Sequence, residues 1–330
     1  MAGARGVAAR LGKAGEFLTG LDTGSYLITA RPWGEPRAPY YIKRPLKNPD
    51  GHGGYTRANR FDDQGIPFSE SQAGPVYHPL VVARYAMRML DVASATGDAV
   101  AARRAAAMLP FLVASGAATA TWGTGSSPDR MSVGRPSCIV QGVVISSLIR
   151  LCGGRPSRDL AALIDRAVDR LIRPVGQGGT LSMLAGGPFL EEMPGSPVSH
   201  ILNGCLYGLF GLYDAADALG HHEAARVARE VEGTLSGGIA GFTAPLGWSY
   251  YALEAHGRRY LARAYYHATH IIQMRVLARR TGLPSLALAA DDWERALRST
   301  TTRLLFAGAK AAQVVWMRDI RRLPLEFVAW

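Results

Sequence analysis

Hydrophobic and polar positions along most of this chain follow two kinds of helical pattern. One kind of segment is apolar on most faces and ends at a glycine, and an amphipathic segment follows it after a short turn. Glycine just past a helix takes the left-handed conformation that ends it, so these glycines mark helix ends. The apolar segments are residues 80–97, 138–154, 201–220 and 267–282, and the amphipathic segments are residues 99–116, 157–173, 221–235 and 286–306.

Four such pairs predict a mainly α fold. An apolar helix needs cover on most sides, and an amphipathic helix can supply that cover from outside. We therefore expect an α/α toroid or a partial (α/α) barrel of about four helix pairs, with the loops that lead into the inner helices on one rim. The pattern leaves open an α-solenoid without a pocket, although the acidic and aromatic residues in these loops favour the toroid.

Composition divides the chain into three parts. Residues 1–75 are rich in Gly, Pro, Asn, Asp and aromatic residues, and strand-like pieces at 26–30 and 40–43 predict a small β-hairpin or an extended arm. Residues 76–308 carry the helix pairs and form the expected catalytic α/α barrel domain. Residues 309–330 have the character of a basic, amphipathic C-terminal tail.

Composition also limits the compartment. Hydrophobic residues make up 48% of the chain and charged residues 19%, which is typical of a globular protein with a substantial core. No apolar run is long enough to span a bilayer, and the basic first segment lacks the apolar block of a secretory signal. We therefore expect a cytoplasmic protein without a transmembrane segment, with peripheral membrane association as the alternative.

The net charge indicates which kinds of partner the protein binds, and the cysteine positions indicate whether it has disulfides or a zinc site. The net charge of +11 favours an acidic partner, but the chain has no Lys/Arg block and no basic motif interleaved with aromatic residues. We therefore expect no nucleic acid, and the charge leaves open an anionic lipid or an anionic polymer. The three cysteines lie far apart in apolar runs and indicate buried thiols, with neither a disulfide framework nor a zinc site.

Residues 247–273 form the densest candidate site. They hold five tyrosines, one tryptophan and three histidines, and Tyr266 and His270 share one helical face. His267 and His270 have the spacing of half a metal site, but no matching ligand set occurs elsewhere, so we expect no metal. Together with Arg263 the cluster favours a pocket that binds a sugar carboxylate. The alternative is that these rings fill the top of the barrel.

A pair of carboxylates, Glu191 and Glu192, stands on a proline-bounded loop before an apolar helix. One of them could serve as an acid or base, but adjacent residues seldom provide both, so a partner must come from another loop. Glu191 is then free to hydrogen-bond the loop itself. The sequence has no phosphate-binding glycine loop and no G-x-S-x-G nucleophile elbow.

Three segments together carry a family resemblance. "FLEEMPGSPVSHILNGCLYGLFGLYD", "GWSYYALE" and "YYHATHIIQM" resemble the C-terminal domain of the D-glucuronyl C5-epimerases, the heparosan and heparan sulfate glucuronyl 5-epimerases and their bacterial relatives. The resemblance implies an isomerase that needs no cofactor and acts on a glycosaminoglycan polysaccharide. It removes the C5 proton of D-glucuronate and returns a proton to the opposite face, which gives L-iduronate. The expected partner is an anionic uronate-containing polysaccharide.

The resemblance also implies roles for particular residues. It assigns the catalytic glutamate to Glu192 and two catalytic tyrosines to Tyr266 and Tyr251, with Tyr250 as an alternative to Tyr251. An arginine of the family pattern near Glu254 is missing. The residues that we expect to line the substrate site are Tyr77, Gln141, Glu191, Asn203, Trp248, Arg263, His267 and His270.

The main departure from the family pattern is Met193, where the family has a catalytic tyrosine. Methionine cannot transfer a proton, so two other functions stay open. One is a polysaccharide lyase that also begins with abstraction of the C5 proton, and the other is a non-catalytic glycan-binding protein of the same fold. A homodimer is compatible with the sequence, which does not identify the glycan.

Overall fold

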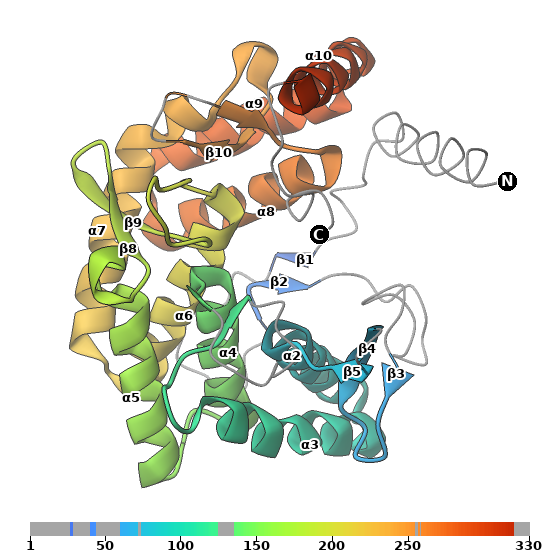
Figure 1. The fold of residues 1–330 in the computed structure, drawn as a ribbon, viewed down its shortest axis with the longest axis vertical. Helices are drawn as coiled ribbons and strands as arrows, with labels where there is room; N and C mark the ends of the chain where they lie inside the picture. The colour runs from blue at the N-terminus through green and yellow to red at the C-terminus, as the bar shows by residue number, and fades with distance from the viewer. Residues whose placement is uncertain are drawn as a thin grey trace, which may run out of the picture.

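The helices form an open arc of four pairs around an apolar centre (Figure 1). The computed structural model describes residues 27–28, 40–43, 60–71, 74–124, 135–254, 257 and 259–319. The predicted mainly α fold, a partial α/α barrel, is confirmed. The inner helices are α2 (Pro79–Thr96), α4 (Cys138–Leu151), α6 (Leu202–Leu219) and α8 (Ala264–Thr281), and the outer helices are α3 (Ala99–Gly116), α5 (Arg158–Ile172), α7 (His222–Gly238) and α9 (Pro284–Arg298).

Each inner helix packs against its neighbours in the arc and against the outer helix that follows it. At the closest contact, α4 meets α6 through glycine: a Cβ atom on Gly142 would lie 2.4 Å from the carbonyl oxygen of Tyr207. A Cβ atom on Gly211 would lie 2.5 Å from the Cα atom of Gly142. These distances are too short for any side chain, so glycine at both positions lets the two helices approach this closely.

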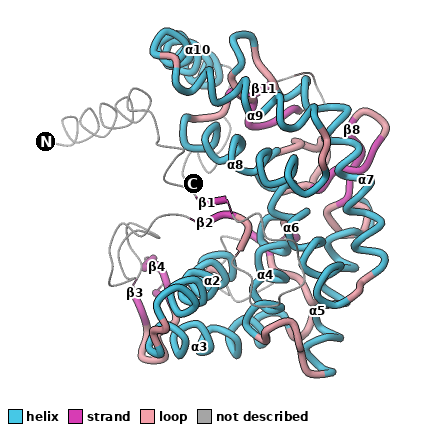
Figure 2. Tube along the Cα trace, turned by 180° about the vertical axis from the view of Figure 1, so that it is seen from behind, coloured by secondary structure: helices cyan, strands magenta, loops and turns pink. Residues whose placement is uncertain are grey.

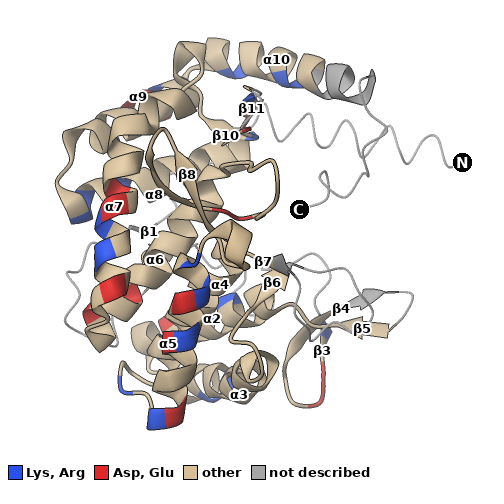
Figure 3. Ribbon diagram, turned by 60° about the vertical axis from the view of Figure 1, so that its left-hand side comes forward, with Lys and Arg blue, Asp and Glu red and all other residues tan. Residues whose placement is uncertain are grey.

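The outer helices carry the polar surface. Figure 3 shows charges of both signs along α5 and α7. Side chains cap three of these helices, since Asp98 Oδ1 accepts from the backbone N–H of Val100 at 2.7 Å, Ser157 Oγ from that of Leu160 at 3.3 Å and His221 Nδ1 from that of Ala224 at 3.1 Å. Glycine ends the inner helices as predicted, with left-handed φ values of 71°, 66° and 70° at Gly97, Gly220 and Gly282.

A small antiparallel sheet precedes each inner helix, where the sequence had suggested only loops. The hairpin before α6 docks on the start of α4, because the backbone N–H of Cys138 donates to the carbonyl oxygen of Glu191 at 3.0 Å. In the same way the hairpin before α8 docks on the start of α6 through the bridge between Ile201 and Ala252. The hairpins therefore line one rim, which is the arrangement that we expected for the loops.

The strands of these sheets are short. They are β3 (Arg60–Phe61), β4 (Pro67–Ser71) and β5 (Gly74–Val76) before α2, β6 (Gly123–Thr124) and β7 (Arg135–Pro136) before α4, β8 (Leu181–Leu184) and β9 (Gly187–Leu190) before α6, and β10 (Tyr250–Leu253) and β11 (Arg259–Leu261) before α8.

The N-terminal strands enter the arc. The predicted pairing of the two strand-like pieces is confirmed, because β1 (Leu27–Ile28) and β2 (Ile42–Lys43) are antiparallel and lie between α2 and α8 (Figures 1 and 2). Beside them, Tyr41 Oη donates to Asp214 Oδ1 at 2.7 Å, and Arg150 Nε donates to Asp214 Oδ2 at 3.1 Å. This buried ion pair anchors β2 to α4 and α6.

Two boundaries differ from the sequence analysis. The amphipathic helix predicted over residues 286–306 breaks at Ser299, whose backbone is extended (φ −75°, ψ 116°). The helix that follows, α10 (Thr300–Asp319), runs through the expected start of a tail at residue 309. Lys310 holds α10 on the rim, since its Nζ donates to the carbonyl oxygen of Leu261 at 2.7 Å. Residues 320–330 of the expected tail lie outside the described residues.

None of the helices in the described part of the chain has the length and apolar character needed to cross a membrane.

Candidate active site

Glu192 lies at the rim, directly after β9 and against the first turn of α6. A Cβ atom on Gly204 would be 2.4 Å from Glu192 Oε2, so glycine is required there to make room for the carboxylate. Asn203 Nδ2 makes a long contact of 3.5 Å with the same oxygen. Burial raises the pKa of Glu192 to about 7, and the positive charge of Arg84 on α2 opposes this rise. The carboxyl group therefore titrates near neutral pH, as an acid–base catalyst should.

Glu191 has a different role. Its side chain is completely buried, and Oε1 accepts from Ser182 Oγ at 2.5 Å and pairs with His200 Nδ1 at 2.7 Å. Oε2 accepts from the backbone N–H of His200 at 3.1 Å. The structure therefore places Glu191 as a clip that joins the two ends of the loop carrying Glu192. Both Glu191 oxygens contact groups of the protein itself, and the expectation that this side chain lines the substrate site stays a prediction.

Tyr251 and Tyr266 meet at the same rim from β10 and α8. Their ring centroids are 4.8 Å apart at an interplanar angle of 56°, and their hydroxyl groups share a hydrogen bond. Burial raises the pKa of Tyr251 well above its usual value, the charge of Glu192 raises it further, and Arg263 lowers it. Tyr251 is thus influenced in one site by Tyr266 and Arg263 from the same part of the chain and by Glu192 from the distant loop before α6.

A β-bulge decides between the two adjacent tyrosines. The ladder between β10 and β11 shifts register between Tyr250 and Ala252, so Tyr251 is the residue that turns towards Tyr266. Tyr250 instead lies under Arg259, whose guanidinium carbon is 5.6 Å from the ring centroid. The structure therefore brings Tyr251, and not Tyr250, to the cluster.

Tyr77 belongs to another part of the rim. Its hydroxyl donates to Asp62 Oδ2 at 2.9 Å, and its ring packs on Phe68 and Phe111 with centroids 5.7 Å and 5.6 Å apart. Burial and the hydrogen bond to Asp62 raise the pKa of Tyr77. These contacts belong to the sheet before α2, and they do not bring Tyr77 to Glu192.

A buried hydrogen-bonded chain lies behind the tyrosine pair. His267 Nε2 is 2.9 Å from the carbonyl oxygen of Trp293, so this nitrogen carries the proton and Nδ1 accepts. Nδ1 lies 3.1 Å from the backbone nitrogen of Ser249 and 2.8 Å from its hydroxyl, which lies 2.9 Å from His270 Nδ1. Burial lowers the pKa of both histidines to about 3, so both rings are neutral. These hydrogen bonds connect the start of β10 to α8.

Four of the residues that we expect to contact the substrate lie in the interior, beside the site. Trp248 stacks on His267 with centroids 3.9 Å apart, and its Nε1 donates to the carbonyl oxygen of Ala262 at 2.8 Å. Gln141 accepts from the backbone N–H of Trp122 at 2.9 Å and donates to two carbonyl oxygens. Direct contact of these residues with the substrate stays a prediction, since the structure shows four buried side chains with polar and stacking contacts inside the protein: Gln141, Trp248, His267 and His270.

Two contributors were missed by the sequence analysis. Gly204 was not recognised as the residue that makes room for Glu192, although it stands inside an apolar helix, where glycine is otherwise unfavourable. Arg84 was not recognised although it is a charged residue within the mostly apolar segment 80–97. In the described part of the chain no group of three His, Cys, Asp or Glu side chains lies close enough together to hold a metal ion.

Replacing Ser249 by alanine should uncouple β10 from α8. The variant loses the hydroxyl that joins His267 to His270, so we expect a loss of stability of about 1–2 kcal/mol. If the link sets the Tyr251–Tyr266 geometry, turnover should fall roughly 10-fold or more at a temperature where the variant is fully folded, with little change in KM. Thermal unfolding and steady-state kinetics measure the two effects.

The matched control is Ser236→Ala, which removes a hydroxyl that lies 2.6 Å from Ser285 Oγ between two outer helices. This variant should lose stability without a change in turnover. Equal turnover in the folded Ser249→Ala variant would show that the serine only stabilises the fold.

Replacing Glu192 by glutamine should stabilise the fold at high pH. The pKa of Glu192 is about 7 in the folded protein against an ordinary value of 4.5, so the wild-type protein loses stability as pH rises from 4.5 through 7. The loss is at most about 3 kcal/mol, reduced by partial solvent exposure. The variant should therefore melt higher than the wild type at pH 8 and equally at pH 4. Equal melting at both pH values would show that Glu192 is not desolvated.

The fold is a partial α/α barrel, and its rim gathers a carboxyl group, two tyrosines and an arginine. A solved structure of cellobiose 2-epimerase from Bacillus thermoamylovorans aligns with a TM-score of 0.54 and 10% identity, over 72% of this chain and 66% of that one. This chain thus spans slightly less than two thirds of that structure, and at this identity the likeness shows the fold alone. No match was found among curated protein sequences.

The chain belongs to the family of the D-glucuronyl C5-epimerase C-terminus. The family's model matches residues 121–295, which is just over half of the chain and includes Glu192, Tyr251 and Tyr266. The suspected family is confirmed, and with it an epimerase domain. The matched region begins after α2 and α3, so those two helices lie outside it.

Proposed function

We propose that this protein is a polysaccharide uronate C5-epimerase that converts D-glucuronate to L-iduronate residues in a heparosan-like polymer. The observation that carries the proposal is one site in which a carboxyl group titrates near pH 7 beside a hydrogen-bonded pair of tyrosines. An exchange of configuration at C5 needs a proton acceptor on one face of the sugar and a proton donor on the other. Membership of the epimerase family supports this assignment.

In the proposed mechanism the Glu192 carboxylate takes the proton from C5. The electron pair of the C–H bond moves into the sugar carboxylate, which becomes an enediolate with an additional negative charge. Tyr266, whose hydroxyl is hydrogen-bonded to that of Tyr251, donates a proton to the opposite face of C5, and proton exchange with solvent restores both groups. The raised pKa of Tyr251 keeps that phenol protonated before the reaction. The positive charge of Arg263, which lies near this pair, offsets part of the developing negative charge.

The test is incubation of the protein with unsulfated heparosan in deuterated water. Incorporation of deuterium at C5, together with the appearance of iduronate, is the expected result. An unsaturated product that absorbs in the near ultraviolet would overturn the proposal in favour of a lyase. Binding of the polymer with neither outcome would overturn it in favour of a glycan-binding protein.

Position 193 tests the departure from the family pattern. Met193 is 41% exposed on the loop next to Glu192, so a tyrosine fits there without repacking the core. If the missing tyrosine limits proton transfer, Met193→Tyr should raise the rate of C5 exchange on heparosan. The rate of deuterium incorporation measures this effect, with Met193→Phe as the control that adds a ring without a hydroxyl. Equal rates in the wild type and both variants would show that position 193 does not face the reacting carbon.

A further inference from the structure

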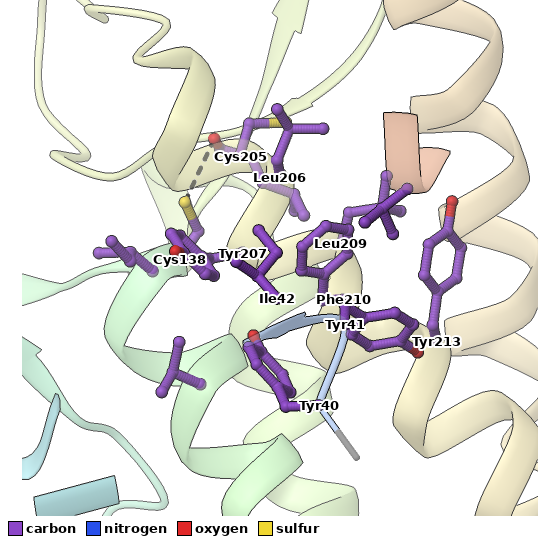
Figure 4. Close-up of a cluster of buried hydrophobic side chains, with 14 of the residues drawn as sticks. Tyr40, Tyr41, Ile42, Cys138, Cys205, Leu206, Tyr207, Leu209, Phe210 and Tyr213 are labelled. Atoms are coloured by element: carbon purple, nitrogen blue, oxygen red, sulfur yellow. Dashed lines mark hydrogen bonds between the residues drawn. The ribbon is translucent and has the colours of Figure 1, made fainter. Parts of the chain in front are cut away.

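A small pocket opens where α2, α6 and β2 meet. Figure 4 shows Tyr40 and Ile42 from the N-terminal strand beside Tyr207 of α6. The pocket is therefore built partly by helix α2 and the N-terminal strand, which lie outside the region matched by the family model. Its lining residues are Tyr40, Ile42, Arg84, Met87, Arg88, Asp91 and Tyr207.

Arg84 gives this pocket its chemical character. Its side chain is half-buried, and its guanidinium carbon lies 5.1 Å from the centroid of the Tyr207 ring. Arg84 has no hydrogen bond or ion pair with any residue that the structure describes. Arg150, which is buried nearby on α4, is paired with Asp214 instead. Since arginines are seldom buried unless they are paired, a half-buried guanidinium at a pocket indicates an anionic ligand.

The position of Arg84 relates the pocket to the catalytic carboxylate. Glu192 lies against Gly204 of α6 and Arg84 lies over the ring of Tyr207, three residues further along the same helix, so the two groups contact neighbouring positions of α6. The charge of Arg84 accordingly acts on Glu192. An anion bound to Arg84 would therefore lie close to the group that moves the proton.

We propose that Arg84 binds the carboxylate of the uronate whose C5 proton Glu192 removes. This inference rests on the proposed function and names the residue that recognises the substrate. A guanidinium group matches a carboxylate with two parallel hydrogen bonds, and the Tyr207 ring holds the plane of the guanidinium fixed. As C5 loses its proton, negative charge builds up on this carboxylate, so the interaction strengthens towards the transition state and supports turnover as well as binding.

The experiment compares two ligands with Arg84→Gln and a control variant. The ligands are an unsulfated heparosan oligosaccharide and the same oligosaccharide with its carboxyl groups reduced to alcohols, and calorimetry measures their affinities. The control, Arg166→Gln, removes one positive charge from the exposed face of α5. We expect Arg84→Gln to bind the charged oligosaccharide about 10- to 100-fold more weakly and the reduced one as the wild type does. Arg166→Gln should leave both affinities unchanged.

Equal affinity of the wild type and Arg84→Gln for the charged oligosaccharide would overturn the inference, as would an equal loss for both oligosaccharides. If Arg84→Gln does not fold, Arg84→Lys is used in its place. Lysine keeps the positive charge but cannot make the two parallel hydrogen bonds of a guanidinium group, so we expect the affinity for the charged oligosaccharide alone to fall roughly 3- to 10-fold. Absence of C5 exchange in the wild type would overturn the proposed function alone, because the affinity comparison still reports on the carboxylate site. Exchange in the wild type without a selective effect of Arg84 would overturn only this inference.

Discussion

Tyr266→Phe should abolish deuterium exchange at C5 while heparosan binding stays nearly intact. The variant keeps the ring that packs on Tyr251 and removes only the hydroxyl that shares its hydrogen bond. A positioned acid or base contributes roughly 10²- to 10⁴-fold to a rate, so we expect a loss in that range. Nuclear magnetic resonance of the polymer in deuterated water measures the exchange, and calorimetry measures the binding.

The neighbouring tyrosine provides a matched control. Tyr265 packs edge-on against Tyr266, with ring centroids 5.3 Å apart, but it is not among the groups that act on Tyr251. Tyr265→Phe removes the same atom one residue away and should retain most of the activity. Undiminished exchange in a folded Tyr266→Phe variant would remove Tyr266 from proton transfer.

Glu192→Gln should reduce C5 exchange by a similar factor, about 10²- to 10⁴-fold. Glutamine fills the space above Gly204 but cannot accept the proton. If Glu192 is the base, it works only when deprotonated, so the wild-type rate should rise as pH increases through about 7 and then level off. A pH–rate profile from pH 5 to 9 measures this rise, and the profile of the variant should lack it.

A variant of the adjacent residue Glu191 tests whether a change in loop structure alone alters the pH dependence of the rate. Glu191→Gln places an amide where three groups approach the carboxylate oxygens, from Ser182 and His200. We expect a clear loss of thermal stability from this variant and no shift in the pH at which the rate of the folded protein rises. A wild-type rate that does not depend on pH around 7 would show that another group is the base.

Periodicity was sufficient to predict the helical framework, because burial of an apolar helix and a glycine end are local properties. The four helix pairs, the glycine ends and the pairing of the N-terminal strands are confirmed. The hairpins on the rim were not predicted, since strands of two to five residues carry too little alternation to stand out from loops. The break at Ser299 was missed for a similar reason, because residues 286–306 keep helical periodicity on both sides of it.

Residue chemistry and motif order were sufficient to select Glu192, Tyr251 and Tyr266 as candidates. Sequence could not decide between Tyr250 and Tyr251, because the choice depends on a bulge in a ladder formed with β11. Nor could it assign Glu191 to a buried clip or His267 to a neutral interior chain, because these roles depend on partners such as Ser182 and Trp293.

The sequence by itself thus determined the class of fold, the family and the candidates for the reactive side chains, since these follow from local patterns and residue types. Only the tertiary structure decided which side chains meet. Desolvation and the nearby charge of Arg84, which lies on a helix more than a hundred residues earlier in the chain, bring the pKa of Glu192 to about 7. Such effects depend on distances across the barrel, and those distances exist only after the helices have packed.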